Sequence, residues 1–261
     1  MLEAAFFQRL TEIFPHTPTA SQSAVLQTLS SFLTNEKSPE KLFLLKGFAG
    51  TGKTTIIASL VSILEQTNIN TILLAPTGRA AKVISEYSKK KAYTIHKHIY
   101  YPKTEIGGIH FVLKNNKEVN ALYIVDEASM ISDKVALGEN SLLNDLISFV
   151  YSGINCKLIL IGDTAQLPPV HTEMSPALDY DILSAYYHKD VTQSILTEVV
   201  RQRKSSGILY NATKIRQKIS KFNQKFQLKL GKYTDFVYLT DKNDIQEALV
   251  DAYSDYGVEE T

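Results

Sequence analysis

The stretch GFAGTGKTT, residues 47–55, decides the fold of this chain. It matches the pattern G-x-x-x-x-G-K-[ST], follows an apolar run at 41–47 and precedes a helical pattern at 54–66. In this context the glycines let backbone N–H groups surround phosphate oxygens, and the helix N-terminus adds a positive dipole. The stretch therefore predicts a phosphate-binding loop. A glycine-rich turn that carries Lys-Thr by chance is the alternative.

The loop pattern assigns a task to individual side chains. Lys53 would reach the β and γ phosphates of a nucleotide, and Thr54 would offer its hydroxyl to Mg²⁺. ATP and Mg²⁺ are therefore the expected ligands. The loop residues expected to contact the nucleotide are Gly47, Ala49, Gly50, Thr51, Gly52, Lys53, Thr54 and Thr55.

Four apolar runs alternate with helical segments along the chain. Leu, Ile and Val take consecutive positions in these runs, as in parallel strands that are covered on both faces. The start of the chain, MLEAAFFQRLTEIF, reads as an amphipathic helix. Strands are expected at 41–47, 70–77, 121–128 and 156–163, and helices at 54–66 and 78–88. The pattern predicts an α/β P-loop NTPase with a wound parallel sheet flanked by helices.

Acidic and amide side chains follow two of these strands. Asp126 and Glu127 end one run, and Asp163 and Gln166 follow another. Because ligands bind beyond the carboxyl ends of parallel strands, we expect all four beside the phosphate loop. Asp126 would hold Mg²⁺, directly or through water, and Glu127 would act as the base that orients the attacking water. Asp163 and Gln166 would face the γ-phosphate. The alternatives are a turn with a helix cap and a plain strand exit stiffened by two prolines.

Two segments interrupt the alternation of strands and helices. Residues 97–120 place Gly-Gly and Asn-Asn between short aromatic and β-branched runs, which predicts a small inserted hairpin. Past residue 201 the charges separate, since 214–232 holds seven basic residues and no acid, and 233–261 holds eight acids and one lysine. A second domain is expected to begin there. The basic run is either part of a DNA track or the solvated face of a helix.

Charge, cysteine content and hydropathy indicate which partners and which compartment to expect. Lys plus Arg number 28 against 27 for Asp plus Glu, so a polyanionic partner would have to be held by a local patch. The single cysteine, Cys156, lies in an apolar run, where a buried inert thiol is expected rather than a nucleophile. This usage fits a reducing compartment, and a cytoplasmic location is expected. No apolar run has the length of a membrane span, so no membrane partner is expected.

The motifs, in their order, resemble superfamily 1 DNA helicases, specifically the B class of RecD-like and Dda-like enzymes. GFAGTGKTT is similar to motif I of that family, and VDEASM (125–130) to motif II. The run QLPPV favours the B class, because A-class helicases typically continue with Gln-Ser-Ile-Tyr. The other matches are APTGRAA (75–81) with motif Ia, TIHK (94–97) with motif Ib, GDTAQLPPV (162–170) with motif III and LTEVVRQ (196–202) with the start of motif IV.

The resemblance covers about residues 15–205 and implies a domain organisation. A RecA-like ATPase domain would occupy residues 1–200, with the hairpin at 97–120 as its pin-like insertion. Residues 201–261 would be the incomplete start of a second RecA-like domain. Motifs V and VI of the family are not found in these 261 residues, which implies an N-terminal fragment that is weak or inactive in unwinding.

The resemblance also implies roles for residues outside the phosphate loop. Gln22, ahead of the first strand, would read adenine, and Arg201 would act as the arginine finger on the transferring phosphoryl group. Pro76, Thr77 and His96 would touch single-stranded DNA. For His96, a helix cap or a place in the core is the alternative.

In the family, the inserted hairpin carries the strand-separating pin. An aromatic residue at its tip would stack on the last base pair. Tyr100, Tyr101 and Phe111 are the candidates, and each is equally suited to anchor the hairpin on the parent domain.

The function that the resemblance implies is an ATP-driven motor. It would step 5′ to 3′ along single-stranded DNA and unwind duplex at junctions of single and double strands, as a monomer. One alternative is a P-loop kinase, which would carry a lid with clustered arginines. The other is a module that binds nucleotide and DNA without turnover.

Overall fold

The computed structural model describes most of the chain, and its compact parts are two units, Met1–Val200 and Arg201–Thr261. The second domain predicted past residue 201 stays a prediction. The described residues are 3–35, 40–67, 69–105, 108–134, 140–169, 172, 174–200, 206–219, 227–230, 233, 235–236, 239 and 241–256.

The first unit is built on a six-stranded sheet with the strand order β3-β2-β6-β7-β1-β8, in which every pair is parallel. The predicted wound parallel sheet of a P-loop NTPase is therefore confirmed. Four strands lie in the four predicted runs, and the two edge strands, β3 and β8, were not predicted. The strands are β1 (Lys41–Gly47), β2 (Asn70–Ala75), β3 (Ala92–Thr94), β6 (Ala121–Val125), β7 (Lys157–Gly162) and β8 (Asp190–Leu196).

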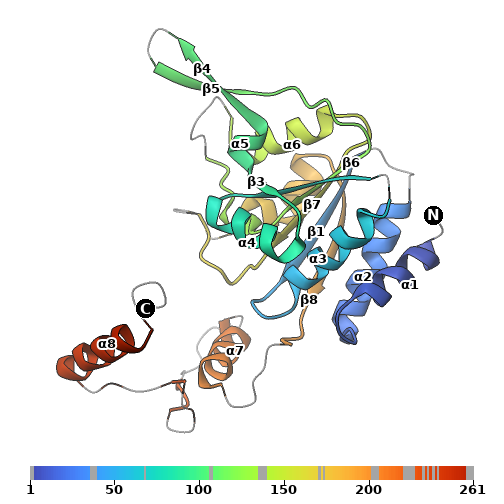
Figure 1. Ribbon diagram of the computed structural model, residues 1–261. Helices are drawn as coiled ribbons and strands as arrows, with labels where there is room; N and C mark the ends of the chain where they lie inside the picture. Colours follow the sequence, from blue (N-terminus) through green and yellow to red (C-terminus); the bar gives the residue numbers. More distant parts are fainter. Residues whose placement is uncertain are drawn as a thin grey trace. The chain divides into compact units, whose positions relative to one another are not determined.

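Side chains of the central strands alternate between two buried faces. In β1, Phe43 and Leu45 join one apolar cluster, and Leu42 and Leu44 join the other. Because both faces are covered, the central strands are apolar at consecutive positions. The first face packs on α1 (Glu3–Ile13), α2 (Ala20–Thr34), α3 (Lys53–Leu64) and α4 (Gly78–Ser88) (Figure 1). The second packs on α5 (Ile95–Ile99), α6 (Leu142–Ser152), η1 (Ala128–Met130), η2 (Pro176–Leu178) and η3 (Ile182–Tyr186).

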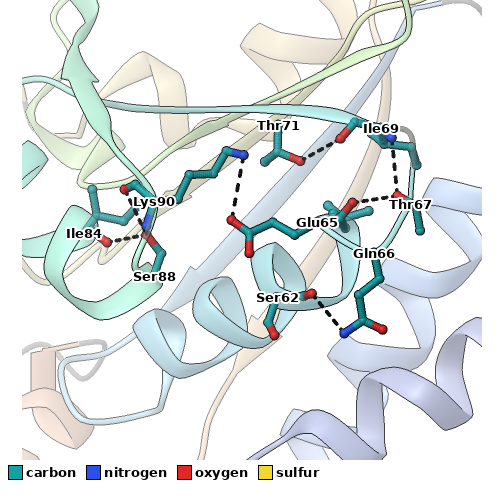
Figure 2. A network of polar contacts seen from close by, with 10 residues as sticks. Ser62, Glu65, Gln66, Thr67, Ile69, Thr71, Ile84, Ser88 and Lys90 are labelled. Carbon is teal, nitrogen blue, oxygen red and sulfur yellow. Dashed lines mark hydrogen bonds and ion pairs between the residues drawn. The ribbon is translucent and has the colours of Figure 1, made fainter.

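Polar contacts stabilise the C-terminal ends of α3 and α4, which lie at the edge of the sheet opposite the phosphate loop (Figure 2). Thr67 Oγ1 donates to the Leu64 carbonyl at 2.8 Å, and Ser88 Oγ donates to the Ile84 carbonyl at 2.6 Å. Both helices begin at the carboxyl ends of strands and lead into the amino ends of the next ones. Ser88 is therefore remote from any site at the carboxyl edge.

The predicted hairpin insertion is formed by β4 (Tyr100–Glu105) and β5 (Gly108–Leu113), which pair antiparallel. Figure 1 shows it projecting away from the six-stranded sheet. Lys114 fixes its base, because its N–H donates to the Ile99 carbonyl at 2.7 Å. The Lys114 ammonium also donates to the carbonyls of Lys97 (3.0 Å) and His98 (2.9 Å) at the end of α5. The hairpin therefore leaves the domain through a fixed joint.

The second unit contains α7 (Gly207–Ile219) and α8 (Lys242–Tyr256). Asp235 caps α7, since its carboxylate accepts from the Gly207 N–H at 2.7 Å. Asn211 is buried and donates to the Lys229 carbonyl at 3.1 Å. Only part of the basic run 214–232 lies within the described residues, so its two readings stay open.

Two expectations drawn from composition have structural counterparts. Cys156 is buried, and this burial raises the pKa of its thiol, as expected of an inert side chain. Within the described ranges, no helix combines the length and the apolar content that crossing a membrane requires.

Candidate nucleotide site

The phosphate loop joins β1 to α3 and needs glycine at three places, one of which is Gly50 with its left-handed φ of 79°. Gly52 has a φ of 95°, in the left-handed region, and a Cβ there would lie 2.5 Å from Gln22 Nε2. A Cβ on Gly47 would lie 2.8 Å from both Thr51 Oγ1 and Leu196 Cβ. Any larger residue would push the loop away from its neighbours. The glycine pattern thus has a steric cause as well as a phosphate-binding one.

Lys53 begins α3 and lies against the loop. Its ammonium donates to the carbonyls of Gly47 at 2.6 Å and Phe48 at 3.0 Å. Thr51 Oγ1 also donates to the Phe48 carbonyl, at 2.7 Å, so the loop is held as a tight turn. The following Thr54 and Thr55 are half-buried in the first turn of α3. The Lys53 ammonium therefore lies at the N-terminus of α3. A phosphate bound there would attract the ammonium in addition to the two carbonyls.

Asp126 ends β6 as a buried carboxylate. Its Oδ1 accepts from the Glu127 N–H at 2.9 Å. The pKa of Asp126 is raised to about 6, chiefly by burial. The hydrogen bond from the Glu127 N–H lowers it, the charge of Glu127 contributes to the rise, and the charge of Lys53 lowers it. A buried carboxylate with so high a pKa is stabilised by any cation that reaches it.

Glu127 departs from ordinary backbone geometry. Its φ of 56° places it in the left-handed region, which glutamate rarely adopts, and its side chain is half-buried. Strained backbone of this kind is common at functional sites, and here it coincides with the residue predicted to orient water.

Asp163 and Gln166 follow β7, which lies between β1 and β6 in the sheet. Asp163 is buried, and its Oδ1 accepts from the Ala165 N–H at 2.8 Å. Gln166 is exposed, and its Oε1 accepts from Ser129 Oγ at 2.6 Å. The ends of β1, β7 and β6 are thus neighbours, as the sequence predicted. The structure brings Lys53, Asp126, Glu127, Asp163 and Gln166 to one edge of the sheet, while their individual roles stay predictions.

Gln22 lies against the phosphate loop. Its Nε2 donates to the Thr51 carbonyl at 3.0 Å, and its Oε1 accepts from the Thr19 N–H at 3.0 Å as part of the capping box of α2. The side chain is buried. Gln22 therefore connects α2 to the phosphate loop. Its recognition of adenine stays a prediction.

The segment after β8 is fastened to the same region. Glu198 accepts from the Ser21 N–H and the Ser21 hydroxyl, both at 2.9 Å. The Val200 N–H donates to the Gly50 carbonyl at 2.9 Å. Sequence reasoning missed the role of Glu198, although an acid that pairs with a helix N-terminus is a known pattern. The predicted arginine finger, Arg201, lies outside the described residues.

The predicted DNA-contacting residues follow two neighbouring strands, the edge strand β3 and the interior strand β2 beside it. Pro76 and Thr77 come after β2, His96 comes after β3, and the two strands pair. Thr77 also caps α4, because its Oγ1 accepts from the Ala80 N–H at 3.2 Å. His96 is half-buried beside Tyr100, with ring centroids 5.8 Å apart, and burial lowers its pKa.

The structure separates the three aromatic candidates for the pin. Tyr100 pairs with Leu113 at the base of the hairpin and is only 7% exposed, so it is an anchor. Tyr101 and Phe111 are 44% and 37% exposed. Neither belongs to the outermost described pairs, which are Glu105 with Gly108 and Thr104 with Ile109, and the tip itself lies outside the described residues, so the stacking role stays a prediction.

Comparison with known proteins identifies the family. A family model described as an AAA domain matches residues 19–231. The chain belongs to this AAA domain family. It is 33% identical over 130 residues to the ATP-dependent RecD2 DNA helicase of Deinococcus radiodurans, covering 50% of this chain and 16% of that protein. It is also 33% identical over 175 residues to the ATP-dependent DNA helicase dda of Enterobacteria phage T4, covering 66% of this chain and 37% of that protein.

These matches confirm the resemblance to RecD-like and Dda-like superfamily 1 helicases. This chain matches well under half the length of either relative. Among solved structures, the Pif1 helicase from Bacteroides in complex with ADP-AlF3 and ssDNA is 19% identical, with a TM-score of 0.46. That match covers 92% of this chain and 58% of that one.

The residues at the site also fit a Mg²⁺–nucleotide complex. Lys53 lies against the loop, whose backbone is packed so closely that a Cβ at Gly47 or Gly52 would clash with a neighbouring side chain, and the buried carboxylate of Asp126 has a raised pKa. Carboxylate and hydroxyl oxygens together with phosphate oxygens are the usual ligands of Mg²⁺. Thr54 and Asp126 are therefore the residues that would hold the ion.

Proposed function

We propose that this chain is the ATP-hydrolysing motor domain of a DNA helicase. It would couple ATP hydrolysis to stepping 5′ to 3′ along single-stranded DNA and to unwinding at junctions with duplex. The observation that carries the proposal is the convergence of the phosphate loop, Asp126, Glu127 and Gln166 on three adjacent strand ends. The similarity to two ATP-dependent DNA helicases supports the choice of substrate.

In the proposed reaction, loop N–H groups and Lys53 hold the β and γ phosphates. Thr54 and Asp126 would hold Mg²⁺, which supplies charge neutralisation at the phosphate oxygens. Glu127 orients a water molecule and accepts its proton as the new bond to the γ-phosphorus forms. The bond from that phosphorus to the bridging oxygen breaks, which leaves ADP and phosphate.

Gln166 would report the presence of the γ-phosphate, because a carboxamide N–H can donate to one of its oxygens. In the proposal, Arg201 adds positive charge to the same phosphoryl group, and Gln22 reads the adenine. Gln22, bonded to the Thr51 carbonyl, would also connect the base to the phosphate loop.

Pro76, Thr77 and His96 are proposed to contact single-stranded DNA. Such contacts, mostly to phosphates and stacked bases, make binding independent of sequence and sensitive to salt. The exposed Tyr101 and Phe111 are the remaining candidates for stacking on the hairpin. The proposed partner is a single-stranded DNA with a duplex junction, and the proposed active species is a monomer in the cytoplasm.

Phosphate release from ATP, with and without oligo-dT, tests the proposal. A motor domain should hydrolyse ATP faster when single-stranded DNA is bound, and the stimulation should fall as salt rises. Equal rates with and without DNA would count against a motor. They would favour a second candidate, a module that binds nucleotide without coupling to DNA.

A further inference from the structure

A hydrogen bond between Ser129 and Gln166 joins the turn after β6 to the loop after β7. We propose that Ser129 is a positioning residue whose hydroxyl fixes the Gln166 carboxamide, so that the amide N–H groups face the γ-phosphate of bound ATP. This inference rests on the proposed function, in which Gln166 detects the γ-phosphate. It assigns to the Ser129 hydroxyl the task of orienting Gln166.

Gln166 needs a partner to hold one orientation. It is exposed, and the next residue, Leu167, is 90% exposed, so little packing restrains this loop. A glutamine side chain has three rotatable bonds and loses much freedom when fixed. The contact at 2.6 Å from Ser129 Oγ to Gln166 Oε1 supplies the restraint.

Ser129, by contrast, is held rigidly. It is 2% exposed within η1, and a Cβ on Gly162 would lie only 3.1 Å from its backbone nitrogen. Ser175 secures the same turn from the other side, because its buried hydroxyl lies 2.9 Å from the Ala128 carbonyl and 2.6 Å from the Ile131 carbonyl. Ser129 is thus a fixed point to which the exposed glutamine is attached.

The direction of the bond decides what Gln166 can offer. Because Ser129 donates to Oε1, the acceptor end of the carboxamide is turned toward the protein, and the donor end is left for a ligand. Amide donors suit phosphate oxygens, and the γ-phosphate is the group that distinguishes ATP from ADP. Ser129 also lies two residues after Glu127, so one turn carries the water-orienting and the nucleotide-reading functions.

The test is the ability of the 261-residue chain to distinguish ATP from ADP. Displacement of fluorescent mant-ADP by ADP and by the non-hydrolysable analogue AMP-PNP gives the ratio of the two affinities. Ser129→Ala should lower the preference for AMP-PNP about three- to tenfold, the value of one hydrogen bond, and should leave ADP affinity unchanged. Ser88→Ala is the matched control, since it removes another buried serine hydroxyl at the opposite edge of the sheet.

A double-mutant cycle separates positioning from a merely structural effect. In a Gln166→Leu background, Ser129→Ala should have no further effect on the ratio, whereas a structural effect would persist and overturn the inference. Because Gln166 is exposed, the Gln166→Leu variant should fold even if the Ser129→Ala variant does not. If Gln166→Leu leaves the preference intact, the inference falls while nucleotide binding stands. If the unmodified chain binds neither ligand, the proposed function falls with it.

Discussion

Replacing Tyr100 with phenylalanine tests how the hairpin is attached. The Tyr100 hydroxyl donates to Asp145 Oδ2 at 2.7 Å, and Asn140 Nδ2 lies 3.3 Å from the other oxygen of the same carboxylate. Asp145 is 6% exposed, so water cannot easily replace the lost donor. A hydrogen bond to a buried charged group contributes roughly 1.5–3 kcal/mol. We therefore expect Tyr100→Phe to destabilise the first unit by about 2 kcal/mol.

For a unit of the size of Met1–Val200, a loss of about 2 kcal/mol lowers Tm by roughly 4–8 °C. Thermal unfolding followed by circular dichroism measures the change. Tyr101→Phe is the matched control, because it removes the same hydroxyl from the next residue, which is 44% exposed. A cycle with Asp145→Asn isolates the pair. The reasoning is refuted if Tyr100→Phe lowers Tm no more than Tyr101→Phe does.

Two further changes address the loop and the segment that follows β8. Gly52→Ala should destabilise the unit by about 1–2 kcal/mol from its left-handed φ alone and should abolish ADP binding, because the new Cβ would displace Gln22. Gly78→Ala, where a Cβ meets nothing within 4 Å, is its control, and equal ADP affinities in the two variants would contradict the steric argument. Glu198→Gln should lower Tm near pH 7 but not in acid. Hydrogen bonds from Thr19 and Ser21 lower the Glu198 pKa below 4.5, so its contribution is present above that value and lost as pH falls through the folded pKa. A Tm difference that persists at pH 3 would argue against this.

The sequence predicted the strands whose apolar pattern follows from burial on both faces. β1, β2, β6 and β7 lie inside the sheet, and each has a continuous apolar run. The edge strands lacked that pattern. β8 has only exposed and half-buried positions before Leu196, and β3 has three residues, all half-buried. Their pairing with β1 and β2 depends on tertiary contacts that no local pattern encodes.

The candidate site was predictable where chemistry depends on a residue type at a strand end. Asp126, Glu127 and Gln166 were found in this way. The links of Ser129 to Gln166 and of Glu198 to Ser21 were not, because they join residues 37 and 177 positions apart. Serine and glutamate are common on protein surfaces, so neither residue stands out until the fold brings the partners together.

The hairpin shows a different limit of the sequence. Tyr100 and Tyr101 are adjacent tyrosines, and composition gives no reason to separate them. Successive residues of a strand point to opposite faces, so the register places Tyr100 against Asp145 of α6 and leaves Tyr101 exposed. Only the fold shows which of the two is the anchor.

The central claim is that Lys53, Asp126, Glu127 and Gln166 surround the phosphates of one Mg²⁺–nucleotide complex. Calorimetric titration of Mg²⁺ and AMP-PNP into the unmodified chain, Lys53→Ala and Glu127→Gln tests it most directly. The account predicts one site per chain, binding weakened at least about tenfold by Lys53→Ala, and binding retained by Glu127→Gln, because the lysine holds phosphate and the glutamate serves the reaction. Equal affinity of the unmodified chain and Lys53→Ala would contradict it.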